Sequence, residues 1–274
     1  MLSLLRAAEP LAAPLLLHAA LRAARTLSPE RRAVLLDAVR RPLSAREEAV
    51  QAPIVRLRSV LAADSTPVAV RDYGAGTRAR MLGTEAKPES RPIAEIYDKA
   101  AASPAWGGVL FRLARALRPR RVLELGTNLG VSAGHLQTAL ALNEIEAGIQ
   151  GYLVSIEGDP TLATMARAHL AGIQSPSQPT TVVTGRFDEA LPTVLQAHGP
   201  FDLVFLDGHH EEAATVRYWH QIAPHLAPGA CVVFDDIEPG HDVRRAWRSI
   251  CAAHPSAERV DLLKLGVLFV DGEA

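Results

Sequence analysis

The sequence predicts an α/β fold: a sheet of five parallel strands with a C-terminal antiparallel hairpin, flanked by helices, and an N-terminal helical extension. From residue 120 onward, short apolar runs rich in β-forming residues alternate with helical stretches. Continuous apolar runs of this kind are typical of parallel strands that helices cover on both faces. Near the end, the runs in ERVDLLKLGVLFVDG are separated only by KLG. This link is too short for a helical crossover and therefore predicts an antiparallel pair.

The first 90 residues have a different pattern. Most of them are apolar at helical spacing, with a helix-start signal of serine, proline and glutamate at residues 28–30, and a loop-rich connector follows. We interpret residues 1–90 as a helical extension and residues 91–274 as the main domain. The extension would form a lid, a wall of the substrate site or a homodimer surface, and the sequence leaves these three roles open.

The main domain begins with two helices in RPIAEIYDKAAASPAWGGVLFRLARAL, separated at Ser103-Pro104. The parallel strands follow in the order RVLELG, GYLVSIE, TTVVTG, FDLVFLD and ACVVFDD. The helices between them are expected in VSAGHLQTALAL, PTLATMARAHL, DEALPTVLQA and EEAATVRYWHQIAPHL. In parallel sheets of this kind, ligands bind at the carboxyl ends of the strands. The residues that end each strand are therefore candidate site residues.

Composition narrows the class of protein. The chain is 48% hydrophobic and 22% charged, which is ordinary for a globular protein, and its net charge of −1 gives no electrostatic reason to bind nucleic acid. The apolar N-terminus is interrupted by proline and charged residues, so neither a membrane span nor a signal peptide is expected. Cys231 and Cys251 have no disulfide or metal spacing, and two buried thiols fit a cytoplasmic protein.

Two glycine-rich stretches compete for the role of cofactor loop. DYGAG, at residues 72–76, is followed by no predicted helix, so we interpret it as a turn near the site. ELGTNLG, at residues 124–130, follows a strand and leads at once into a helix, as a ligand-binding loop requires. The next strand ends in Glu157, whose carboxylate can accept hydrogen bonds from both ribose hydroxyls. The dinucleotide pattern Gly-x-Gly-x-x-Gly is not met, which argues against NAD.

The loop from Glu124 through Gly130 resembles the first motif of class I S-adenosylmethionine-dependent methyltransferases, and Glu157 resembles their ribose-binding acid. The resemblance covers about residues 90 to 272 and implies a Rossmann-like seven-stranded sheet. It also implies that Gly126 and Asn128 lie along the methionine part of S-adenosylmethionine and that Ser132 holds its carboxylate. By the same resemblance, the residues on the adenine side are Phe187 and Asp188.

Acidic residues follow the fourth and fifth parallel strands. Asp207 ends FLD, and Asp235 and Asp236 end VVFDD. Because neighbouring parallel strands end at the same edge of the sheet, these carboxylates should converge. Three carboxylates repel one another and raise one another's pKa unless a cation lies among them. Oxygen ligands of this type suit Mg²⁺ or Ca²⁺, so the sequence predicts a divalent metal site.

The same acids resemble those of metal-dependent O-methyltransferases of the catechol and macrolide-sugar types. His210 stands three residues after Asp207, where these families place a catalytic base. Histidine has a suitable pKa for removing a hydroxyl proton near neutral pH. We therefore predict methylation of a small-molecule hydroxyl, with Asp207 and His210 as catalytic residues. His209 is expected to point elsewhere.

Other interpretations remain open at this stage. Each acid could merely cap a turn or helix. In metal-free relatives of the same fold, an acid at the position of Asp207 has this role. The chain could then be a metal-independent methyltransferase, or a cofactor-binding protein without catalysis whose helical region binds a partner. Metal dependence of turnover separates the first two activities, and any turnover excludes the third. The acceptor molecule has no motif in the sequence.

Overall fold

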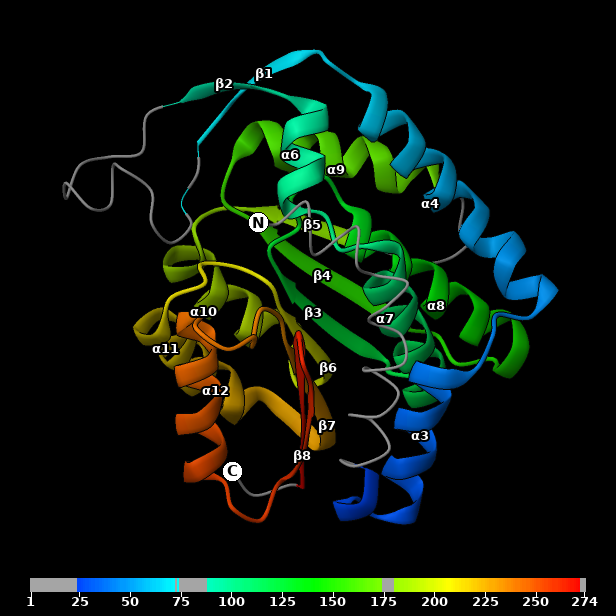
Figure 1. Ribbon diagram of the computed structural model, residues 1–274, viewed down its shortest axis with the longest axis vertical. Helices are drawn as coiled ribbons and strands as arrows, with labels where there is room; N and C mark the ends of the chain where they lie inside the picture. Colours follow the sequence, from blue (N-terminus) through cyan, green and yellow to red (C-terminus); the bar gives the residue numbers. More distant parts are fainter. Residues whose placement is uncertain (1–23, 72, 74–87, 174–179, 272–274) are drawn as a thin grey trace.

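The computed structural model describes residues 24–71, 73, 88–173 and 180–271. Over these residues the chain forms a seven-stranded sheet in the order β5-β4-β3-β6-β7-β9-β8 and a separate two-stranded sheet, β1-β2 (Figure 1). The strands are β1 (Pro67–Val70), β2 (Glu89–Pro92), β3 (Arg121–Leu125), β4 (Tyr152–Glu157), β5 (Thr180–Thr184), β6 (Phe201–Leu206), β7 (Leu226–Phe234), β8 (Glu258–Leu262) and β9 (Leu265–Val270). The predicted helix over the first 23 residues lies outside the described residues, as does DYGAG apart from Tyr73.

The helices follow the predicted order through the main domain. They are α3 (Pro29–Arg40), α4 (Ala45–Ala63), α6 (Ile93–Ala100), α7 (Pro104–Leu117), α8 (Val131–Ala147), α9 (Pro160–Gly172), α10 (Phe187–His198), α11 (Glu212–Ile222) and α12 (Asp242–Ala253), with short 3₁₀ turns η1 (Ala24–Thr26) and η2 (Ala223–His225). The side chain of Asp159 accepts from the Leu162 N–H at 2.9 Å to begin α9. Ser28, in the predicted start signal of α3, does not cap that helix, because its hydroxyl donates to the Glu258 carboxylate at 3.2 Å instead. None of the described helices is both long and apolar enough to span a membrane.

The sheet confirms the predicted topology. Strand β3 pairs in parallel with β4 and β6, and these pair in parallel with β5 and β7. Strand β9 is antiparallel to both β7 and β8, so the two-residue link Leu263-Lys264 closes a hairpin. The register sets Phe234 of β7 opposite Gly266 of β9. The turn between β8 and β9 therefore lies at the carboxyl end of β7, where the acidic pair begins.

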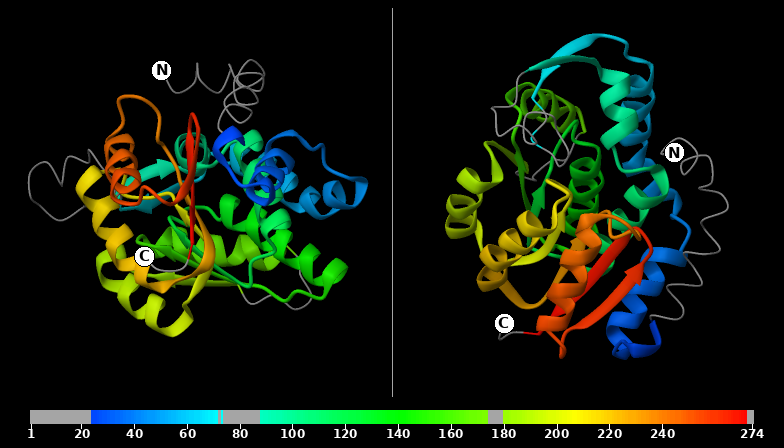
Figure 2. Two further views of the ribbon diagram at one scale, coloured as in Figure 1. Left: turned by 90° about the horizontal axis from the view of Figure 1, so that it is seen from below. Right: turned by 60° about the vertical axis from the view of Figure 1, so that its left-hand side comes forward.

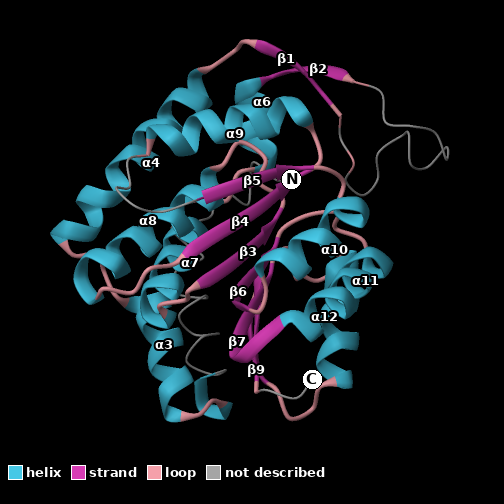
Figure 3. Ribbon diagram, turned by 180° about the vertical axis from the view of Figure 1, so that it is seen from behind, coloured by secondary structure: helices cyan, strands magenta, loops and turns pink. Residues whose placement is uncertain are grey.

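Helices cover both faces of the sheet (Figures 1 and 3). Successive residues of β3 point to opposite faces: Val122 lies in the core under α3, α7 and α8, whereas Leu123 lies in the core under α10, α11 and α12. Figure 2 shows α3 beside the β8–β9 hairpin, where the Ser28 N–H donates to the Glu258 carboxylate at 2.9 Å. Both faces are thus closed, as the continuous apolar strands predicted.

The described part of the helical extension packs into the main core. Helix α3 lies against α7 and α4 lies against α8, and Leu35, Ala38 and Ile54 belong to the same buried cluster as Phe111. The predicted boundary between residues 90 and 91 falls inside β2, which pairs with β1 on the other side of that boundary.

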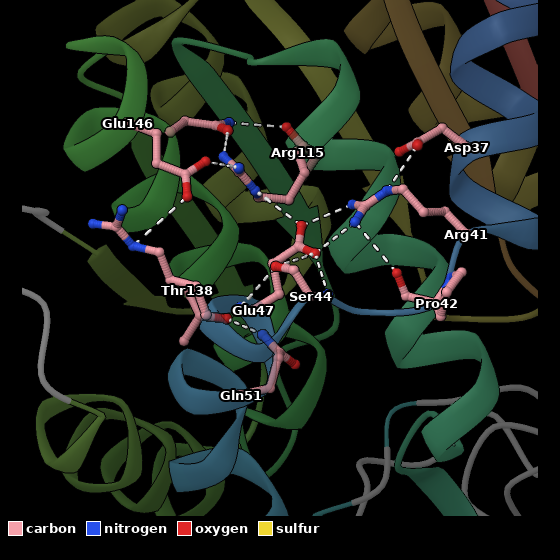
Figure 4. A network of polar contacts seen from close by, with 12 residues as sticks. Asp37, Arg41, Pro42, Ser44, Glu47, Gln51, Arg115, Thr138 and Glu146 are labelled. Atoms are coloured by element: carbon pink, nitrogen blue, oxygen red, sulfur yellow. Dashed lines mark hydrogen bonds and ion pairs between the residues drawn. The ribbon is translucent and has the colours of Figure 1, made fainter.

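A polar network also joins the extension to the main domain (Figure 4). Glu47 is 3% exposed and forms a capping box with Ser44 at the start of α4. Its carboxylate accepts two hydrogen bonds from Arg41, at 2.6 and 2.7 Å, and one from Arg115 of α7 at 3.5 Å. One turn further along α4, Gln51 donates to Thr138 of α8. Charged and amide side chains therefore fix α4 onto α7 and α8.

Candidate active site

The glycine loop joins the ends of two neighbouring strands. Gly126 directly follows β3 and has a φ of +102°, a conformation that side chains rarely adopt. A Cβ at this position would lie 1.8 Å from the carbonyl oxygen of Asp207, which directly follows β6. Gly126 therefore allows close backbone contact between the loop predicted to bind the cofactor and the loop that carries the acids.

Glu157 lies beside this loop, as predicted. One oxygen of its carboxylate accepts from the Asn128 N–H at 2.7 Å, and the other accepts from the Asp159 N–H at 2.8 Å. Asn128 has a φ of +47° and Gly130, which begins α8, has a φ of +82°. Burial raises the pKa of Glu157, and the two backbone hydrogen bonds oppose that rise. The loop and the acid at the end of β4 thus form one unit.

Glu124 is fully buried beneath the loop. The Ser155 hydroxyl donates to its Oε2, while within the described part of the chain its buried Oε1 accepts no hydrogen bond. Burial raises the pKa of Glu124 to about 7, although the nearby hydroxyls of Ser155 and Ser132 lower it. A buried carboxylate with a free oxygen suits a ligand that brings a positively charged donor.

Phe187 and Asp188 begin α10 but face different neighbours. The Phe187 ring lies against Gly208 and meets the ring of Tyr218 edge-on, with centroids 5.6 Å apart. The Asp188 carboxylate forms an ion pair with Arg217 of α11 at 2.9 Å. The structure therefore places Phe187 next to the loop after β6. The adenine-side role of both residues stays a prediction.

The predicted acids and the predicted base come together at the ends of β6 and β7. The His210 Nδ1 lies 3.3 Å from Oδ2 of Asp236, and its Nε2 lies 3.8 Å from Oδ1 of Asp207. Asp235 is 5% exposed, and its Oδ1 accepts from the Asp236 N–H at 2.8 Å. An imidazole is thus held between two carboxylates, next to the glycine loop.

Comparisons with known proteins agree with this geometry. A family model described as a methyltransferase domain matches residues 123–237, which include both the glycine loop and the acids. The resemblance to class I S-adenosylmethionine-dependent methyltransferases that the sequence indicated is thereby confirmed over this segment. A catechol O-methyltransferase of Mycobacterium tuberculosis is 38% identical over 145 residues, which are 52% of this chain and 59% of that protein. The chain therefore spans less than two thirds of the length of that relative.

Two further relatives share the same chemistry by name. A catechol O-methyltransferase of Niastella koreensis is 28% identical over 187 residues, covering 63% of this chain and 79% of that protein. The crystal structure of the O-methyltransferase TomG from Streptomyces achromogenes, involved in tomaymycin synthesis and solved with S-adenosylmethionine, has 26% identity. It aligns with a TM-score of 0.51 over 71% of this chain and 86% of TomG. The predicted fold is confirmed.

Sequence reasoning missed one residue of the candidate site, Lys264. Its Nζ lies 2.9 Å from Oδ1 of Asp235 and also contacts Oδ1 of Asp236. Lys264 is in the turn between β8 and β9, which the pairing of β9 with β7 brings to the acids. The signal available in the sequence was a lysine, rare in this chain, in a hairpin expected beside the fifth parallel strand.

The acids at the strand ends differ in pKa, and the ammonium of Lys264 is one cause of the difference. Burial raises the pKa of Asp236, but Lys264 and His210 lower it more, so this pKa lies below its usual value. Burial raises the pKa of Asp207 well above its usual value, and the carboxylates of Asp235 and Asp236 raise it further. Asp236 is therefore the carboxylate that most favours the ionised form, and it is the one in contact with both Lys264 and His210.

The predicted metal ligands Asp207, Asp235 and Asp236 do not form one compact group of ligand atoms in this structure. Among the described residues, the one group of three acidic, histidine or cysteine side chains whose ligand atoms all lie within 4.8 Å is Asp236, Glu238 and His241. Asp207 and Asp235 are not part of such a group, and Lys264 already contacts Asp235 and Asp236. The metal site therefore stays a prediction.

His209 points away from the acids, as expected. Its φ of +65° turns the side chain toward α11, where the Nδ1 lies 2.8 Å from the Tyr218 hydroxyl. The two adjacent histidines thus have separate partners. Of the two, His210 is the one that contacts the carboxylates at the strand ends.

Proposed function

We propose that this chain transfers the methyl group of S-adenosylmethionine to a hydroxyl oxygen of a small molecule. The observation that carries the proposal is the His210 imidazole, held by Asp236 on one side and facing Asp207 on the other, beside the glycine loop. The names of the relatives favour catechols and related phenols as the first acceptors to test.

The residues beneath and around the loop fit S-adenosylmethionine. The free Oε1 of Glu124 would accept from the ammonium of the methionine part, and Ser132 lies beside that acid to bind the carboxylate. Glu157 would exchange its two backbone hydrogen bonds for the ribose hydroxyls. When bound, the cofactor supplies an electrophilic methyl group on a sulfonium.

His210 would remove the proton of the acceptor. If its Nδ1–H donates to Asp236, the Nε2 lone pair is free to take the hydroxyl proton as the oxygen forms its bond to the methyl carbon. Asp236 would fix the tautomer and stabilise the imidazolium that results, a role that carboxylates have in other histidine bases. Asp207 would accept a hydrogen bond from the acceptor or from the imidazolium.

Two versions of this activity differ in the positive charge beside the acids. The version predicted from the sequence uses Mg²⁺ or Ca²⁺. It is favoured by the position of Asp207, whose pKa is raised by burial and further by the carboxylates of Asp235 and Asp236. The metal-independent version is favoured by the contacts of Lys264 with Asp235 and Asp236. We take the second as the version that the geometry supports better.

A single assay tests the activity. The purified chain is incubated with S-adenosylmethionine and a panel of catechols, phenols and sugars, and methylated products are measured by mass spectrometry. We expect O-methylation of at least one member with formation of S-adenosylhomocysteine. Calorimetric binding of S-adenosylmethionine without turnover of any acceptor would leave only a cofactor-binding protein.

A further inference from the structure

Both the backbone and the ammonium of Lys264 contact the loop that carries Asp235 and Asp236. Its carbonyl oxygen accepts from the Ile237 N–H at 2.9 Å, so the β8–β9 turn is fixed to the loop that follows the acidic pair. Its side chain is 23% exposed, and the ammonium lies against Asp235 and Asp236. Both ends of the residue therefore bind the same loop.

The charge of Lys264 is maintained by its surroundings. Its ammonium lies 2.9 Å from Oδ1 of Asp235 and also contacts Oδ1 of Asp236, so two carboxylates compensate its positive charge. Removing one member of a buried ion pair leaves an uncompensated charge, which is strongly unfavourable. The acidic pair therefore has a permanent positive partner from within the chain.

The contacts continue from Lys264 to the base. Asp236 contacts Lys264 through Oδ1 and His210 through Oδ2, the latter at 3.3 Å from Nδ1. The backbone of Asp236 has a φ of +56°, a conformation that a non-glycine residue keeps only when its surroundings hold it. The ammonium, the carboxylate and the imidazole form one chain of contacts that ends at the proposed proton acceptor.

We infer that Lys264 is the resident cation of this site: it replaces a divalent ion at Asp235 and Asp236 and positions Asp236 against His210, so methyl transfer needs no metal. This inference rests on the proposed function. Lys264 acts through Asp236 and is a positioning residue. In the transfer step, the hydroxyl proton goes to Nε2 of His210, the oxygen–carbon bond forms, and the carbon–sulfur bond breaks to release S-adenosylhomocysteine.

The first experiment uses the unaltered chain. Turnover of the best acceptor is measured after dialysis against EDTA, with EDTA in the assay, and then with Mg²⁺ in excess over the chelator. We expect rates within about twofold of one another. Turnover that disappears in EDTA and returns with Mg²⁺ would overturn the inference and leave the proposed function intact.

The second experiment removes the ammonium. Lys264→Met should lower kcat by about 10²-fold, because Asp236 loses its partner and the imidazole loses its support. Millimolar Mg²⁺ should then restore part of the rate, since the vacated acids can take a divalent ion. The dissociation constant for S-adenosylmethionine, measured by calorimetry, should remain within about threefold. Lys264→Arg should keep more activity and stay insensitive to Mg²⁺.

Controls separate charge from damage to the fold. Lys99→Met removes a lysine of α6 that pairs with Glu95 on the surface, at 2.7 Å, and should change neither kcat nor the response to Mg²⁺. Loss of activity in Lys264→Met without any response to Mg²⁺ would reduce Lys264 to structural support and overturn the inference. Full activity of Lys264→Met in EDTA would overturn it too. If Lys264→Met fails to fold, the chelator assay on the unaltered chain and the activity of Lys264→Arg still test the inference.

Discussion

His210 and His209 are adjacent in sequence but have different partners, which makes them a matched pair for testing the base. His210→Ala should lower kcat by about 10²–10⁴-fold, the usual contribution of a positioned general base, with little change in affinity for S-adenosylmethionine. The loss should be smaller for acceptors whose hydroxyl is already acidic. His209→Ala removes a hydrogen bond to Tyr218 and should cost about 1 kcal/mol of stability but little kcat. Equal losses of kcat in steady-state assays would indicate general damage to the loop.

Tyr73, the described residue of the DYGAG motif, provides a second test at this scale. Its ring lies against Gly158, directly after Glu157, and the guanidinium of Arg186 lies 5.7 Å from the ring centroid. Asp159 anchors the same segment by accepting from the Arg71 N–H at 2.7 Å. This position, between the ends of β4 and β5, is where the adenosine part of the cofactor is expected.

Tyr73→Ala should therefore raise the dissociation constant for S-adenosylmethionine by about 10-fold, because stacking of one base on an aromatic ring contributes about 1–3 kcal/mol. Tyr73→Phe keeps the ring and should bind like the unaltered chain. Tyr97→Ala, which removes a ring that lies over Arg58 instead, is the control. Calorimetry that gives one dissociation constant for all of these chains would exclude Tyr73 from the cofactor site.

At the scale of elements, Glu47 connects the start of α4 to the main domain and should make the stability of the protein depend on acid. The hydrogen bonds from Arg41 are the main reason that the pKa of Glu47 falls to about 2 from the 4.5 of a free side chain. A lowered pKa contributes stability above pH 4.5 that is lost as the pH falls through 2. The difference corresponds to roughly 3 kcal/mol.

Glu47→Gln should therefore lower the free energy of unfolding at pH 7 by roughly 2–4 kcal/mol and weaken its decline between pH 4.5 and 2. Urea denaturation at several pH values measures both effects. Glu48→Gln, on the exposed side of the same helical turn, should change neither. A Glu47→Gln chain as stable as the unaltered one would mean that Arg41 and Arg115 stabilise α4 only weakly.

The sequence predicted the elements of the main domain better than the contacts between them. The acids were predicted because the carboxyl ends of parallel strands share one edge, a rule that needs only strand endings. The role of Lys264 depends on which strand the terminal hairpin pairs with, and KLG alone does not specify this. The need for glycine at position 126 also comes from a distant contact: a Cβ there would meet the carbonyl oxygen of Asp207, and no local sequence pattern indicates this. The contact of Glu47 with Arg115 joins residues far apart in the chain and likewise has no local signal.

For the whole molecule, the described part of the extension belongs to the same core as the sheet. Leu35, Ala38 and Ile54 are at most 1% exposed, and the carbonyl oxygen of Ala38 accepts from Nε of Arg112 at 2.6 Å. The buried ring of His135 contacts the Gln51 amide oxygen at 2.5 Å. Removing residues 1–90 would expose apolar side chains of α7 and α8 and leave Arg112 and His135 without these partners.

A chain of residues 91–274 should therefore fail to unfold cooperatively, although it contains the glycine loop and Glu157. The loss of three buried aliphatic contacts alone would cost several kcal/mol, which is comparable to the whole stability of a typical domain. Circular dichroism during urea titration measures cooperativity, and calorimetry measures binding of S-adenosylmethionine. Cooperative unfolding, with an affinity no weaker than that of Tyr73→Ala, would show that the extension is a separate unit, free to act as a lid. A broad transition with lost binding would show that it completes the core that holds the glycine loop in place.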